Sequence, residues 1–95
     1  MHNKTFTCPV CGYKDLKEPA YDEHGCSSFE ICPSCGTEFG NDDARRTHEE
    51  LRHLWLAAGA PWKSKSVSVP AGWTALGQLR ESGLGVTSIT SQGNI

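Results

Sequence analysis

The sequence contains Cys8-Pro9-Val10-Cys11-Gly12 and repeats the pattern as Cys32-Pro33-Ser34-Cys35-Gly36, with twenty residues, 12 to 31, between Cys11 and Cys32. Two residues between paired cysteines let the chain turn so that both sulfur atoms point at one centre, and proline sets φ at the start of the turn. Glycine after the second cysteine accepts a positive φ. We call residues 8–12 the first knuckle and residues 32–36 the second knuckle. Two facing knuckles can surround one ion with four sulfurs. The spacing therefore predicts a metal site with the ligands Cys8, Cys11, Cys32 and Cys35.

Paired cysteines have two other uses, in disulfide bonds and in redox catalysis. Disulfides belong to oxidising compartments, and a redox C-x-x-C motif needs a thioredoxin-like βαβ setting that this sequence lacks. The first residues hold no apolar stretch typical of a secretory signal, and no run of about 18 apolar residues predicts a membrane span. We therefore expect a cytoplasmic protein whose reduced cysteines bind a metal.

The length and composition of the chain make such a metal useful for folding. The chain has 95 residues, of which 37% are hydrophobic and 21% charged. A core this small seldom supplies more than about 3–5 kcal/mol, and small domains commonly add a metal or disulfides. The same numbers exclude a large catalytic barrel and a doubly wound sheet. We expect a small metal-stabilised α+β protein, in which an N-terminal four-cysteine zinc ribbon (residues 1–40) precedes one amphipathic α-helix and a tryptophan-containing extension that packs on it (residues 41–82).

The charge balance argues against nucleic acid as the partner. The formal net charge is −2. Four thiolates on one divalent ion would lower it to about −4. Binding to nucleic acid normally needs a basic face, and the sequence shows none. A nucleic-acid-binding zinc ribbon therefore stays an alternative by analogy alone.

The sequence indicates the four ligands of the metal, but the ligands alone do not choose between zinc and iron. Four sulfurs in a tetrahedron suit zinc or iron. The knuckles Cys8–Gly12 and Cys32–Gly36 resemble those of rubredoxins, which use iron for electron transfer, but the interval between them is shorter and a helix that rubredoxins lack follows. We favour one structural zinc ion and keep a rubredoxin-like iron electron carrier as the alternative.

Short alternating stretches lead into both knuckles. Residues 5–7 and 28–31 alternate polar and apolar side chains, which predicts short antiparallel strands, and the polar residues 17–27 predict a loop. We expect a small apolar layer beside the metal, made by Phe6, Phe29, Ile31 and Phe39. The loop carries the fifth cysteine, Cys26, which we interpret as a spare, semi-exposed thiol, with a reactive thiol or a substitute ligand as the alternatives.

A helix is predicted over residues 43–58. Residues 41–43, Asn-Asp-Asp, are suited to cap its N-terminus, and Gly59 is suited to end it. Arg45–Glu49 and Arg46–Glu50 have the i, i+4 spacing of ion pairs on its wet face. The apolar face expected from the helical period consists of Leu51, Leu54, Trp55 and Ala58.

The same helix contains a sequence similar to the zinc-protease motif H-E-x-x-H. His48 and His53 are one residue too far apart, and at i, i+5 they point about 140° apart around the helix. A catalytic zinc also needs an open coordination position, which four cysteines would fill. We therefore expect two surface histidines and no enzymatic activity.

The remaining segment carries two large aromatic residues, Trp62 and Trp73. They are expected to cover the helix near Trp55, or to anchor a protein partner, because tryptophan is enriched at interface hot spots. Thr74 is suited to cap one or two helical turns over residues 75–80. Residues 83–95 are rich in Gly, Ser and Thr, and we expect them to be a disordered tail.

The knuckles, the Glu30-Ile31-Cys32-Pro33 lead-in and the helix that ends in Ala58-Gly59 together resemble the bacterial cysteine-rich CPCC family, over residues 6–62. Ser34 stands where the family's name motif has a cysteine. The resemblance implies a small zinc-ribbon protein and no established activity. The function that we expect is a closed structural zinc site whose surrounding surface binds another protein, in an adaptor, regulator or immunity-type role.

Overall fold

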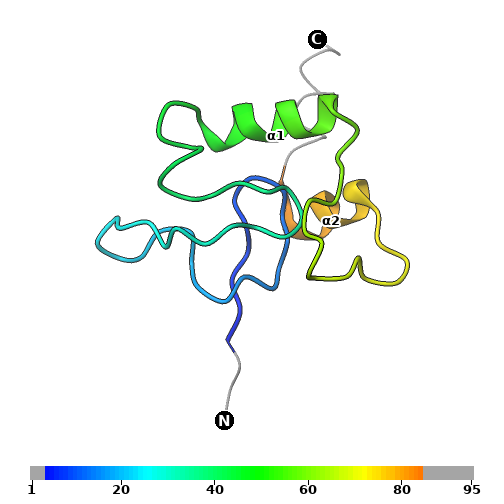
Figure 1. Ribbon diagram of the computed structural model, residues 1–95, viewed down its shortest axis with the longest axis horizontal. Coiled ribbons are helices and arrows are strands. Elements are labelled where there is room, and N and C mark those ends of the chain that lie inside the picture. Colours follow the sequence, from blue (N-terminus) through cyan, green and yellow to red (C-terminus); the bar gives the residue numbers. More distant parts are fainter. Residues whose placement is uncertain (1–3, 85–95) are drawn as a thin grey trace.

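The computed structural model describes residues 4–84. This part of the chain forms two helices, α1 (His48–Ala57) and α2 (Ala75–Ser82), and otherwise turns and irregular backbone. Figure 1 shows α1 lying across one side of the looped N-terminal half. Helix α2 lies beside these loops, below the right-hand end of α1 in this view. Neither helix has the length and apolar character needed to cross a membrane. The tail predicted to be disordered, residues 83–95, lies outside the described residues from residue 85 onward.

β structure is sparse in the N-terminal half. Within residues 4–84 it consists of three isolated antiparallel bridges. They join Phe6 to Leu16, Tyr21 to Ser27 and Ile31 to Glu38. The predicted strands thus shrink to single paired residues, because the turns at residues 9–11 and 33–35 redirect the chain soon after each lead-in.

The hydrophobic core is built around the cysteines. The largest wholly buried side chains apart from the cysteines are Phe39, Leu16, Leu79 and Val10. One cluster contains residues from both sides of the predicted division at residue 40, so α2 and the knuckles share a core. That division stays a prediction.

The apolar layer predicted beside the metal is only half correct. Phe39 is fully buried and Phe6 packs partly buried against the core. The prediction was wrong for Phe29 and Ile31, which are 61% and 58% exposed. Phe29 adopts a φ of 60°, which interrupts the extended backbone that the predicted alternation requires. Both side chains are therefore left on the surface.

Helix α1 begins later than predicted. Its N-cap is Thr47, whose side chain accepts a hydrogen bond from Glu50 N, while the Glu50 carboxylate accepts one from Thr47 N. This reciprocal capping box satisfies two free amides of the first turn. Residues 41–46 form turns before the helix, so the predicted cap at residues 41–43 was wrong. The expected i, i+4 pairs of Arg45 and Arg46 fail for the same reason, since both residues precede α1.

The C-terminal end of α1 follows the prediction more closely. Gly59, at a φ of 96°, donates to Leu56 O, and Ala60 N donates to Trp55 O, the two bonds of a Schellman motif. The buried face differs from the predicted one. Trp55 is buried and Leu51 partly buried, but Leu54 is 50% exposed and Ala58 is exposed.

Helix α2 extends slightly further than predicted. The Thr74 side chain accepts a hydrogen bond from Gly77 N, which confirms the predicted cap, and Gly83 ends the helix in the left-handed region. The helix lies so close to the first knuckle that a Cβ at Gly12 would collide with Ser82. Leu79 of α2 is fully buried in the shared core.

Candidate metal centre

The two knuckles have the same backbone geometry. The Gly12 amide donates to Cys8 O at 2.9 Å, and the Gly36 amide donates to Cys32 O at 2.8 Å. Both glycines have a positive φ, 87° and 81°, which an L side chain would adopt only with strain. The local conformation predicted from the repeated sequence is therefore present in both copies.

The four predicted cysteines lie together. Their sulfur atoms are all within 4.8 Å of one another. Cys8 Sγ is 3.8 Å from Cys35 Sγ, and Cys11 Sγ is 3.6 Å from Cys32 Sγ. All four are free cysteines. Metal–sulfur bonds of about 2.3 Å place the corners of a tetrahedron about 3.8 Å apart, so the spacing fits a single ion bound by four sulfurs.

The site is closed to solvent, and its four sulfur atoms are too close together to carry four negative charges without a cation. Cys8, Cys11 and Cys32 are fully buried and Cys35 is 8% exposed. The pKa values of Cys8 and Cys32 are raised, mainly by the hydrogen bond that each makes with Cys11 and also by burial. Hydrogen bonds from the same neighbours, again Cys11 first, lower the pKa of Cys35. Crowded sulfurs cannot all ionise unless a cation balances them, and a divalent ion would replace their protons.

The structure also places Arg52 at the first knuckle, a contact that the sequence reasoning missed. Arg52 is buried on α1, where its Nε donates to Val10 O at 2.7 Å and its guanidinium NH2 group donates to Pro9 O at 2.9 Å. These carbonyls belong to the two residues between the first pair of cysteines. Arg52 precedes Trp55 by three positions and therefore shares its face, which is the signal that could have revealed it.

Gln78 on α2 joins the two knuckles, and it too was missed. Its Nε2 donates to Cys11 O at 3.1 Å and to Ser34 Oγ at 2.9 Å, while its Oε1 accepts from Trp73 Nε1 at 2.8 Å. Ser34, the position that departs from the CPCC motif, is fully buried. The amide thus satisfies polar groups of both knuckles at once.

Asp43 anchors the turn before α1 rather than capping the helix. It accepts hydrogen bonds from Gly40 N (2.7 Å) and Tyr21 Oη (2.6 Å), and His48 Nε2 lies 2.8 Å from its Oδ2. Burial raises the pKa of Asp43, but the hydrogen bonds from Tyr21 and His48 outweigh it, so the pKa lies below its ordinary 3.8.

His53 is exposed, and His48 and His53 do not meet at a metal site within residues 4–84.

The two tryptophans predicted as partner anchors or helix cover lie near the first knuckle. Trp62 packs edge-to-face on Trp73 (ring centroids 5.3 Å apart) and on Tyr13 (5.8 Å). Both indoles are partly buried against the core. Trp62 Nε1 donates to Val67 O. Packing and internal hydrogen bonds therefore fix both rings.

The remaining cysteine, Cys26, is exposed.

Comparison with known proteins gives one partial relative. A stretch of 41 residues is 46% identical to the uncharacterized protein YoaQ of Bacillus subtilis (strain 168), covering 42% of this chain and 35% of that protein. The match thus spans about a third of the relative's length. No family model matches the chain. No solved structure matches it either. The likeness to the CPCC family therefore rests on the sequence motifs alone.

Proposed function

We propose that the four cysteines hold one zinc ion whose role is structural. The observation that carries this proposal is the closed set of four sulfurs at tetrahedral spacing, which leaves no ligand position for water or substrate. The hydrogen bonds of Arg52 and Gln78 support it, because they fix the knuckle carbonyls from both helices. A scaffold role also accords with a protein that is not an enzyme.

Zinc is favoured over iron by the departures from the rubredoxin pattern. The interval between the knuckles is shorter than in rubredoxins, and α1 follows them. The donor set itself suits both metals. Elemental analysis of protein purified from its native cells distinguishes them. One equivalent of zinc in a colourless protein is expected, whereas a red protein with visible charge-transfer bands would establish the iron electron carrier instead.

The second part of the proposal is that the protein acts by binding another protein through the surface that includes Trp62 and Trp73. The segment around Trp73 carries further exposed apolar side chains, since Leu76 is 53% and Val69 48% exposed. Exposed apolar groups near tryptophan are typical of interfaces. Because thiolate ligands need reduced cysteines, a reducing compartment such as the cytoplasm is part of the same proposal.

Capture from native cells tests the interaction. The zinc-loaded full chain serves as bait, and Trp62→Ala and Trp73→Ala are compared with Phe29→Ala, which removes an exposed ring elsewhere. Circular dichroism verifies that each bait is folded. A partner retained by Phe29→Ala and lost by the tryptophan variants is expected. An identical partner list for all baits would refute the proposed surface, and salt-sensitive retention on a polyanion column would favour nucleic acid.

A further inference from the structure

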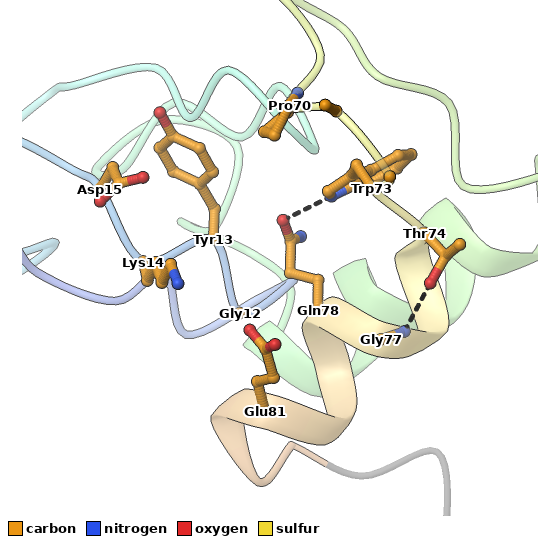
Figure 2. A pocket seen from close by; sticks show the side chains of 12 residues that line it. Gly12, Tyr13, Lys14, Asp15, Pro70, Trp73, Thr74, Gly77, Gln78 and Glu81 are labelled. Carbon is orange, nitrogen blue, oxygen red and sulfur yellow. Dashed lines mark hydrogen bonds between the residues drawn. The ribbon is translucent and has the colours of Figure 1, made fainter.

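A small hollow lies between the first knuckle and α2. It has a volume of about 250 Å³, below the usual range of about 300–1,000 Å³ for drug-sized ligands, and therefore suits a single side chain. Figure 2 shows Tyr13 and Trp73 on opposite sides of Gln78 within it. We call this hollow, lined by residues 12–15, 70–74 and three residues of α2, the aromatic pocket.

The aromatic residues of this pocket are held in place before any ligand arrives. Trp62 packs edge-to-face on both Tyr13 and Trp73 from outside the lining. The Trp73 indole N–H is fixed by its 2.8 Å hydrogen bond to Gln78. Rings that are already immobilised lose little conformational freedom on binding, and aromatic faces attract cations. Trp73 offers the more accessible ring, since it is partly buried and Tyr13 is only 9% exposed.

The charges around the pocket favour a cation as well. Asp15 and Glu81 contribute two carboxylates and Lys14 one ammonium group, for a balance of −1. The hollow beside the second knuckle has the opposite balance, with Arg46 and Lys63 against Asp42. The negative sign is therefore not general to the surface.

We propose that the aromatic pocket receives an arginine side chain of the partner protein. A guanidinium group is planar, stacks on aromatic rings and pairs with carboxylates through several donors, so it matches this combination better than an ammonium group does. This inference rests on the proposed function and assigns its partner's chemistry. It gives Asp15 and Glu81 the role of pairing with the guanidinium, and it makes Lys14 an internal competitor.

The test uses the zinc-loaded full chain, labelled with ¹⁵N, and Nα-acetyl-arginine amide as the probe. Saturable shifts are expected at Trp73 Nε1–H and the Gln78 side-chain amide, and the neutral isostere Nα-acetyl-citrulline amide should cause none. The Asp15→Asn/Glu81→Gln double variant should weaken binding roughly threefold to tenfold, the range expected for two exposed charge pairs. Lys14→Gln should strengthen binding, and Glu49→Gln, an exposed carboxylate on α1, should leave it unchanged.

Three results would overturn the assignment to arginine. They are an equal response to citrulline amide, unchanged binding in the double variant, and tighter binding of Nα-acetyl-lysine amide. A further comparison separates this inference from the proposed function. If Trp73→Ala abolishes capture of a partner while Asp15→Asn/Glu81→Gln captures it as well as the native chain, the interaction surface stands and the arginine pocket is refuted.

Discussion

Arg52 Nε lies 2.7 Å from the carbonyl oxygen of Val10, 42 positions earlier in the sequence. This hydrogen bond attaches α1 to the peptide that links the first pair of cysteines. Because the guanidinium also reaches Pro9 O, one side chain satisfies two carbonyls beside the candidate metal. Folding of the helix and assembly of the sulfur cluster are therefore expected to be coupled.

The first prediction concerns this attachment. Arg52→Met keeps much of the buried apolar stem but leaves both carbonyls without their donor, and should lower the free energy of unfolding by about 2–4 kcal/mol. Arg52→Lys should recover only part of the loss, because an ammonium group lacks the fork geometry. Urea unfolding of the metal-loaded protein measures both. Arg45→Met, an exposed position before α1, is the matched control, and an equal effect there would contradict the coupling.

A second prediction concerns the amide that joins the knuckles. Gln78→Ala and Ser34→Ala each remove the 2.9 Å hydrogen bond between these side chains. The double variant should be less destabilised than the sum of the single ones, with a coupling of about 1 kcal/mol. Strict additivity in urea unfolding would show that the bond contributes nothing. Ser66→Ala, in an exposed turn, provides the baseline.

The third prediction locates the start of α1. Thr47→Ala removes the capping box and should cost about 1 kcal/mol of stability. Asn41→Ala tests the cap that the sequence suggested, and should have a smaller effect because Asn41 lies in a turn before the helix. The order of the two midpoints in thermal unfolding decides the matter; a larger loss for Asn41→Ala would place the helix start where the sequence indicated.

A fourth prediction is a pH dependence. The hydrogen bond to Asp43 raises the pKa of Tyr21 above its ordinary 10.0. A pKa that is higher in the folded state means that the contribution to stability is complete below about pH 10 and is lost as the pH rises through the folded value. In a Tyr13→Phe background, tyrosinate absorbance should therefore appear at higher pH in the folded than in the urea-unfolded protein. Asp43→Asn should reduce this difference. Coincident titrations would show that the bond does not persist in solution.

The parts of the structure that the sequence predicted are those governed by neighbouring residues. The knuckle turns follow from proline and glycine at fixed places beside the cysteines. The cap at Thr74 likewise depends on a contact with Gly77, only three residues away. Such local rules hold whatever the rest of the chain does, so the turns of both knuckles and the second helix could be anticipated.

The missed features depend on distant partners. No contact was predicted for Arg52, because the acceptors of its hydrogen bonds are far away in sequence and belong to the first knuckle. Phe29 and Ile31 had a strand pattern, but a single bridge gives no second layer to cover them. The N-terminal end of α1 was misplaced because several polar residues before the helix could serve as its cap. Asp43 instead accepts hydrogen bonds from Tyr21 and Gly40.

The central claim is that four sulfurs bound to one ion replace much of the core that this chain lacks. The most direct measurement is thermal unfolding followed by circular dichroism, on reduced protein with its metal and after treatment with a chelator. We predict that one equivalent of metal is released, that the cooperative transition disappears with it, and that added zinc restores the transition. A chelated, metal-free protein that melts cooperatively at the same temperature would contradict the claim.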